Sequence, residues 1–323
     1  MSNRFLTKFQ VLLAKIESTY GSDPTPTAGA NAKEVSNLIV NLNAEPEERD
    51  IHRNTLSQDA PIASKRFAEI QFAMELKGSG TPGTAPAIGD LLRACGMAES
   101  VGDDGGGSSS VVYTPGSSDH DSITVYRYQI LDGTDCKLQK FVGSRGTFNI
   151  VLAAGKKAMI EFNFRAAISG ADSDGSTPTP TYGETTKPPI VQSAAFSWNS
   201  VTALRCQALN LDIANEVVQD EDVNAAGAGL IGFIITGRKP NGRFNPDVIQ
   251  ISANNFKDEW ENATERALSI VVGSTAGNIC TITAPKCSID SVSDEDLNGK
   301  AKMALPFRMN RNSADDELVL TFS

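Results

Sequence analysis

The sequence predicts a mainly β protein made of two tandem β-sandwich or β-barrel domains, each with one short α-helix. At about 100–200 residues per domain, the 323 residues suffice for two. Runs in which apolar and polar residues alternate, such as residues 67–76 and 204–213, are typical of half-buried strands. Residues 169–189 are small, polar and proline-rich, so they are expected to separate two pieces of similar size.

The first piece is expected to begin with a strand at residues 37–43, followed by a long polar loop and the alternating strand at 67–76. A short amphipathic helix at about 88–95 is predicted to end at Gly96, because glycine readily adopts the left-handed conformation that closes helices. Further strands are expected at residues 122–131, 137–152 and 156–165, with turns at 132–133 and 154–155 and breaks at Gly143 and Gly146.

The second piece is expected to repeat this order. Its predicted elements are strands at 204–213, 230–236, 267–272, 280–289, 301–309 and 317–322, a polar loop at 219–229, a helix at 255–264 with Phe256, Trp260 and Ala263 on one face, and a turn at 290–299. The match in order indicates a duplicated β unit. We therefore expect domains at residues 1–168, including an N-terminal arm, and 190–323, joined by a linker at 169–189.

The charge balance excludes a protein that grips nucleic acid through its phosphates. Lys and Arg total 29 against 39 Asp and Glu, a net charge of −10, whereas such proteins are basic. Residues 1–170 hold 17 basic and 19 acidic residues and residues 171–323 hold 12 and 20, so the second half carries most of the negative charge. Surrounding DNA without holding it remains compatible with this composition.

No motif predicts catalysis, a cofactor or a metal. There are only two histidines; His120, between Asp119 and Asp121, lies where a solvated loop is expected and no structured nucleophile accompanies it. The five cysteines form no C-x-x-C pair and are interpreted as reduced thiols, although Cys280 and Cys287 could pair. The acidic turn at 290–299 lacks the glycine and terminal glutamate of a calcium loop. The sequence therefore predicts a structural protein and no enzyme.

No targeting or membrane segment is expected. The N-terminal residues lack an apolar signal core, and no run approaches the roughly 18 apolar residues of a membrane helix. We expect synthesis in a cytoplasm and no membrane association.

Several segments together resemble the tail tube (major tail) proteins of long-tailed bacteriophages. They are residues 12–24 (LLAKIESTYGSDP), 72–80 (FAMELKGSG), 91–97 (LLRACGM), 113–115 (YTP), 142–147 (VGSRGT), 235–242 (ITGRKPNG) and 273–278 (GSTAGN). No single segment is diagnostic, but their order and spacing extend over nearly the whole chain.

The resemblance implies a virion protein that assembles into stacked rings, forming the hollow tube through which DNA passes to the host. It implies no catalytic site, and partners that are other copies of the chain, the tape measure protein, the tail terminator and tail-tip proteins. With one domain per subunit the simpler relatives form hexameric rings, so two domains predict a trimeric ring of pseudo-sixfold symmetry. Another β-rich virion module, such as a connector, terminator or adhesion protein, is the alternative.

Stacking requires contacts along the tube axis, which loops on a rigid scaffold commonly supply. The N-terminal arm (about 1–35) and the polar loops at about 50–66 and 219–229 are the predicted sites. The candidate contact residues are Arg49, Asp50, His52, Arg53, Asp220, Glu221 and Asp222. A negatively charged lumen is expected as well, because it would let DNA slide.

Overall fold

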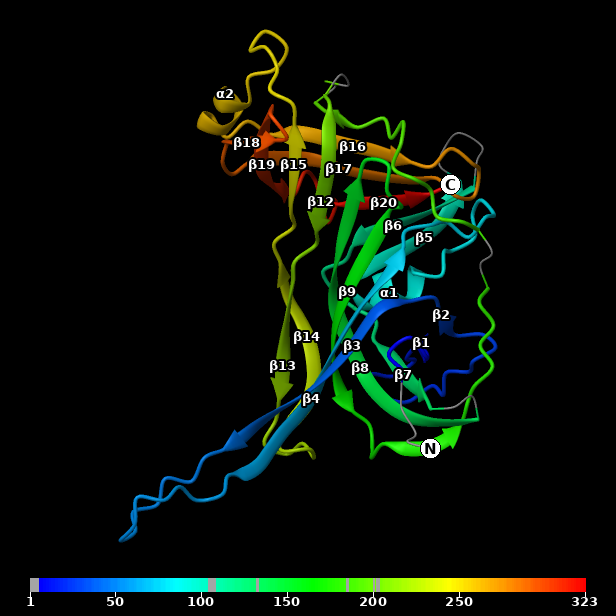
Figure 1. Cartoon of the computed structure of the whole chain (residues 1–323), viewed down its shortest axis with the longest axis vertical. Helices are drawn as coiled ribbons and strands as arrows, with labels where there is room; N and C mark the ends of the chain where they lie inside the picture. The colour runs from blue at the N-terminus through cyan, green and yellow to red at the C-terminus, as the bar shows by residue number, and fades with distance from the viewer. Residues whose placement is uncertain (1–5, 104–108, 132–133, 184–185, 200, 202–203) are drawn as a thin grey trace.

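The computed structural model confirms a mainly β protein (Figure 1). It describes residues 6–103, 109–131, 134–183, 186–199, 201 and 204–323. These residues form 20 strands and two short helices, α1 (Gly89–Ala94) and α2 (Phe256–Glu261). One helix lies in each half of the sequence, as predicted.

Six antiparallel strands form the first strand set. In order of pairing they are β1 (Gln10–Ile16), β7 (Ile123–Ile130), β8 (Asp135–Ala153), β9 (Met159–Ile168), β4 (Ile62–Glu75) and β3 (Ser36–Glu47). Phe148 and Phe162 pack at 6.2 Å between ring centroids, and Phe72 lies 5.6 Å from Phe162. Alternate residues of β4, β8 and β9 thus build one buried aromatic layer.

The second strand set has the same order of pairing. Its strands are β11 (Ser197–Trp198), β16 (Arg266–Val272), β17 (Cys280–Ile289), β19 (Lys300–Asn310), β15 (Asn241–Pro246) and β12 (Cys206–Asp212). Trp198, Phe244 and Phe307 are buried together, with Trp198 and Phe244 at 5.0 Å. The repeated order predicted from the sequence is therefore present in the strand pairing itself.

The remaining strands extend these sets. They are β2 (Ala32–Lys33) on β1, β5 (Met97–Asp103) on β6 (Ser109–Pro115), β10 (Ser173–Ser176) on β8, β18 (Ser293–Leu297) on β19, and β20 (Val319–Phe322) on β17. The hairpin of β13 (Asn215–Glu221) and β14 (Leu230–Arg238) continues β12 and β15 and lies beside the first strand set (Figure 1).

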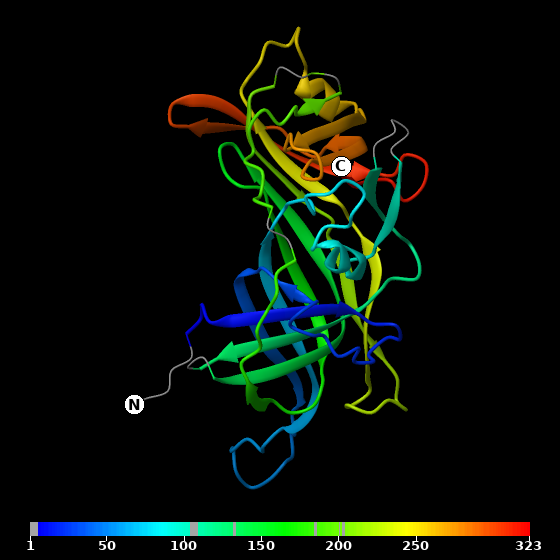
Figure 2. The ribbon, with the colours of Figure 1, turned by 90° about the vertical axis from the view of Figure 1, so that its right-hand side faces the viewer.

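The two sets share hydrogen bonds and core. β12 pairs with the end of β8, where Leu209 faces Leu152 and Leu211 faces Ile150, and β20 pairs with β6. Figure 2 shows the second set stacked above the first along the long axis. One hydrophobic cluster contains buried aromatic residues of both sets, among them Phe148 and Phe162 of the first and Phe244 and Phe307 of the second. Where domain boundaries fall, including those at 168 and 190, stays a prediction.

Glycines allow a further close backbone contact, between the segment after β4 and the turn after β16. Gly80 N donates to Gly277 O at 2.9 Å, and Gly78 N donates to Asn278 Oδ1 at 2.9 Å. Gly277 has φ +80°, and a Cβ there would lie 2.4 Å from Gly80 C. Only glycine satisfies both the conformation and the space at Gly277.

Several predicted elements are corrected. Residues 10–16 of the expected N-terminal arm are β1, with Val11–Ala14 buried in the sheet. The expected turn at 290–299 contains β18, and residues 219–221 of the second polar loop belong to β13. β8 runs through Gly143 and Gly146 with a bulge instead of breaking. The predicted turn at 132–133 lies outside the described residues.

The α2 helix also differs from its prediction. It spans six residues instead of ten, and Phe256 is buried whereas Trp260 keeps 43% of its surface exposed. The Trp260 ring is instead held at the surface, where Nε1 donates to Asp290 O at 3.0 Å. The turn at 154–155 and the helix end at Gly96, with φ +78°, are confirmed.

Candidate assembly surfaces

A two-stranded arm, residues 43–66, projects from the first strand set (Figure 1). β4 pairs with β9 only from Phe67 onward, so nearer the tip it pairs with β3 alone. At the tip, loop 48–61 exposes Ile51 and Leu56, the latter completely. The exposed apolar side chains at its tip make this projecting hairpin a candidate contact surface.

Four of the predicted contact residues lie in loop 48–61. Arg49, Asp50, His52 and Arg53 are all exposed. Arg53 Nη2 lies 3.3 Å from Asp59 Oδ1 within the same loop. An ion pair so exposed contributes little to folding, which leaves these side chains available for contacts with another molecule.

The other three predicted residues end the β13–β14 hairpin. Asp220 is half-buried opposite Gly232, and Glu221 is exposed opposite Leu230. Asp222 begins the turn 222–229, where its amide donates to Gly229 O at 2.9 Å and its Oδ1 accepts from Asn224 N at 2.9 Å. These bonds give the turn a defined shape.

The structure brings the two predicted loops to the same end of the molecule. Lys65 Nζ lies 2.5 Å from Glu221 Oε1, and Gln219 Nε2 donates to Glu45 Oε1 at 2.7 Å. The hydrogen bond with Glu221 raises the pKa of Lys65. The arm and the hairpin thus form one continuous rim, although 156 positions separate Lys65 from Glu221.

Tyr20 anchors the β13–β14 hairpin to the first strand set, a role that the sequence did not reveal. Its hydroxyl accepts from Phe233 N at 2.6 Å and donates to Gly143 O at 3.1 Å. The Arg145 guanidinium lies 4.7 Å over the Tyr20 ring and donates to Phe233 O at 3.1 Å. Burial raises the pKa of Tyr20, so the hydroxyl keeps its proton for this bond.

Phe233 and Asn215 complete the docking of this hairpin. Phe233 is buried and meets Phe67 edge-on at 5.8 Å. Asn215 N donates to Thr147 Oγ1 at 3.1 Å, and its side-chain amide donates to Cys95 O at 2.6 Å. Arg165 Nη1 donates to Val217 O at 3.0 Å. Side chains of the first strand set therefore hold the hairpin along its length.

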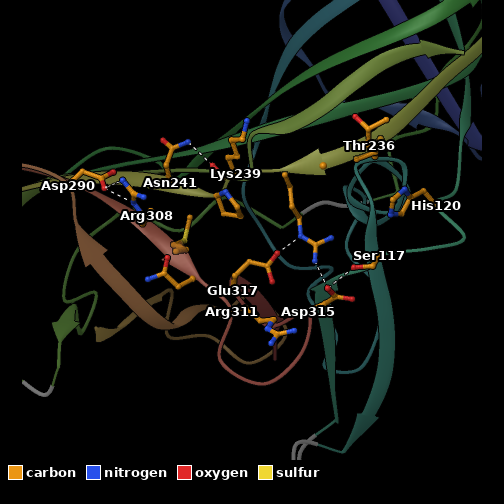
Figure 3. Close-up of a pocket in the computed structure, with 16 residues that line it drawn as sticks. Ser117, His120, Thr236, Lys239, Asn241, Asp290, Arg308, Arg311, Asp315 and Glu317 are labelled. Carbon is orange, nitrogen blue, oxygen red and sulfur yellow. Dashed lines mark hydrogen bonds and ion pairs between the residues drawn. The ribbon is translucent and has the colours of Figure 1, made fainter. Parts of the chain in front are cut away.

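A cleft of about 980 Å³ opens beside the other end of β14 (Figure 3). Arg238 lies along its wall, where it pairs with Glu317 and Asp315 and donates to Gly116 O at 2.5 Å. Lys239, Asn241, Asp290, Arg308 and Arg311 also line it. His120 reaches the cleft too, but its Nε2 lies 3.0 Å from Gly116 O and not against a carboxylate.

One face of the continuous sheet is polar. Gln71, Asn163 and Thr147 face one another across β4, β9 and β8, and Glu161, Asn149 and Asp212 do so across β9, β8 and β12. These six residues line a shallow groove of about 410 Å³. Because strand side chains alternate between faces, the aromatic layer occupies the opposite side. Burial raises the pKa of Asp212.

Within the described ranges, no three His, Cys, Asp or Glu side chains gather as a metal site would require. Nor do those ranges contain a helix of the length and apolar character needed to cross a membrane.

The family of the chain follows from a comparison with protein families. The family model for the phage tail tube protein matches residues 10–307, which is nearly the whole β scaffold described above. No curated protein matches the chain. The family match agrees with the resemblance carried by the sequence segments. The chain belongs to the phage tail tube protein family, and is therefore a structural component of the phage tail.

Proposed function

We propose that this protein assembles into rings that stack into the tail tube, and that DNA passes through its lumen to the host. Family membership supports a structural role and self-assembly with other tail proteins. The proposed number of chains per ring depends on one observation, that the same order of strand pairing occurs twice in one chain. Two strand sets per chain favour a trimeric ring with pseudo-sixfold symmetry.

The polar face of the sheet is the proposed lumen lining. Its carboxylates, Glu161 and Asp212, and its amides offer no cation to a phosphate, and the chain as a whole has a net charge of −10. Repulsion from such a wall would keep DNA from binding as it slides. The role proposed for this surface is that of a conduit without catalysis.

The loop 48–61 and the turn 222–229 are the proposed stacking contacts. Both are exposed at one end of the molecule, and they contain five of the seven predicted contact residues. The other two, Asp220 and Glu221, end β13 just before the turn. The proposed partners are further copies of the chain, the tape measure protein, the tail terminator and the tail-tip proteins. The proposed setting is a siphovirus tail, with the chain synthesised in the cytoplasm of the host.

Electron microscopy of the concentrated protein tests this function. We expect stacked rings with an open lumen and three chains per ring. Six chains per ring would refute the stoichiometry, and a protein that stays monomeric at every concentration, even with tail-tip components, would refute the function. Single rings that never stack would instead favour a connector or terminator.

A further inference from the structure

The two strand sets match in register as well as in order. Both contain the same bulge: Ile123 and Val125 face Ser144 and Phe141, while Arg266 and Leu268 face Cys287 and Ala284. This feature aligns Ser144 with Cys287. The next residues along these strands are Arg145 of β8 and Ser288 of β17. Arg145 faces Arg165 and Ser288 faces Arg308, so Arg165 of β9 is equivalent to Arg308 of β19.

The alignment extends to the buried residues of the next strands. Glu69 faces Arg165 and Asn241 faces Arg308, so Glu69 of β4 is equivalent to Asn241 of β15. Three residues further along, Phe72 is therefore equivalent to Phe244. Phe164 likewise falls on Phe307, and all four phenylalanines are buried. On the outermost strands, residues 37–41 of β3 align with residues 208–212 of β12. Because the two sets share a register, we expect equivalent strands to have equivalent neighbouring strands.

The joint inside the chain uses the outer edge of β12. Residues 208–212 of β12 pair with residues 149–153 of β8, beyond the point where β7 leaves that edge. In the second set, the position of residues 149–153 is taken by β18. Glu161 of β9 faces Asn149, and the residue equivalent to Glu161, Ala304 of β19, faces Ser293 of β18. Among the described residues, β3 pairs only with β4 and β18 only with β19. The two strands equivalent to those of the joint, β3 and β18, therefore each keep a free edge.

The docked hairpin has a counterpart as well. The β13–β14 hairpin continues β12 and β15 and lies against Phe67, Thr147 and Arg165 of the first set. The arm, residues 43–66, occupies the equivalent position on β3 and β4, yet it projects away from the body (Figure 1).

The surface equivalent to the docking site is the large cleft. The counterparts of Phe67, Thr147 and Arg165 are Lys239, Asp290 and Arg308, and all three line the cleft of about 980 Å³ (Figure 3). The arm contacts its own chain through the Lys65–Glu221 and Gln219–Glu45 bonds near its base. The cleft lies at the position in the second set that is equivalent to the docking site of the β13–β14 hairpin.

We infer that these two features meet between neighbouring copies of the chain. β3 of one copy pairs antiparallel with β18 of the next, and the arm of the first copy lies in the cleft of the second. The internal register sets the pairing: Asn41 faces Ser293, Ile39 faces Glu295 and Asn37 faces Leu297. This inference rests on the proposed ring and names its subunit contact.

The chemistry of the two surfaces suits this contact. Residues 37–41 of β3 carry no charge, whereas β18 carries three carboxylates, Asp294, Glu295 and Asp296. Acidic side chains prevent two β18 edges from pairing with each other, while a neutral β3 edge can pair with one. On the arm, Glu45 and Glu47 would enter a cleft whose lining includes Arg311, together with Lys239 and Arg308. Within the chain, Lys239 pairs with Glu216 and Arg308 pairs with Asp290, so the incoming carboxylates would compete for these cations.

Cysteine cross-linking tests the register. Directly opposed residues have Cα atoms about 4.5–5.5 Å apart, within disulfide range. When Asn41→Cys and Ser293→Cys proteins are mixed, assembled and oxidised, we expect a disulfide-linked pair of chains. The matched control mixes Asn41→Cys with Leu297→Cys, whose Cα lies four residues, or about 13 Å, further along the strand. Each variant alone controls for the five native cysteines.

Tubes of the unaltered protein provide an independent measurement. In hydrogen exchange, the alternate amides of residues 37–41 and 293–297 that point away from β4 and β19 should slow by roughly tenfold or more from monomer to tube, because they gain partners in the new ladder. Tubes that form without this protection, or that cross-link Asn41→Cys equally with Leu297→Cys, would overturn the contact while leaving the tube function standing. A chain that forms neither rings nor tubes would overturn both.

Discussion

At the scale of single residues, the Glu17 carboxylate organises the start of the first strand set. It is buried and accepts four hydrogen bonds: Oε1 from Thr124 Oγ1 and Gly143 N, and Oε2 from Ser122 Oγ and Gly21 N, all within 2.6–2.8 Å. The two oxygens of this side chain thus have the acceptor sites that the four donors need. Glu17 thereby fixes the β8 bulge, against which Tyr20 and the β13–β14 hairpin pack.

The Glu17→Gln substitution should therefore destabilise the protein by about 2–3 kcal/mol, because the new amide group turns donors toward donors. Urea denaturation at neutral pH measures this loss. Glu161→Gln is the matched control on the exposed polar face, and we expect a change within about 0.5 kcal/mol. Equal effects of both substitutions would contradict the role of Glu17.

Asp316 gives stability a dependence on acid pH. Hydrogen bonds from the backbone amide of Asn312 and from Ser313 lower its pKa to about 2. A carboxyl whose folded pKa is depressed stabilises the fold above the unfolded value of about 4, and that contribution is lost as pH falls toward 2. The urea midpoint should therefore fall less steeply from pH 4 to pH 2 in Asp316→Asn than in the unaltered protein. Identical slopes would contradict this assignment.

At the scale of elements, alternation of apolar and polar residues predicted most strands, because each packs one face on the core. β1 was missed because its buried run from Val11 to Ala14 does not alternate. β18 was missed because SDEDL is a turn composition, and only pairing with β19 makes it a strand. Gly143 and Gly146 suggested breaks, whereas the bulge there keeps β8 continuous.

The candidate surfaces were predicted only in part. Polar composition predicted loop 48–61 and turn 222–229, since loops lie at the surface and carry contacts. Sequence patterns could not predict how the β13–β14 hairpin docks, because Tyr20 and Phe233 are 213 positions apart. The pairing of Lys65 with Glu221 was hidden for the same reason. Contacts this distant in sequence arise from tertiary packing and leave no local periodicity.

Loop 48–61 should matter for stacking but not for folding. Replacing residues 50–60 by Asn-Gly removes one exposed ion pair and no buried side chain, so the melting temperature should change by only a few degrees. Sedimentation and electron microscopy should show rings with few or no stacked tubes. Tubes of normal length from this variant would refute the stacking role of the loop.

At the scale of the whole molecule, the two strand sets form one body because their backbones touch. Gly277→Ala should cost about 2–4 kcal/mol, combining a left-handed alanine with a Cβ at 2.4 Å from Gly80 C. Gly155→Ala is the matched control, since Gly155 has φ +73° and open space around it; its cost should stay near 1 kcal/mol. Calorimetry compares the two, and similar losses would argue against tight contact between the sets.

The unequal lengths of loop 48–61 and turn 222–229 have a consequence for tube geometry. Loop 48–61 has 14 residues and turn 222–229 has eight, so a ring of three chains would present long and short projections in alternation. Rotating such a ring by one sixth of a turn would place long projections where short ones belong. Each ring could then settle on the one below in three orientations instead of six, which would hold the helical twist of the tube to a narrower set of values.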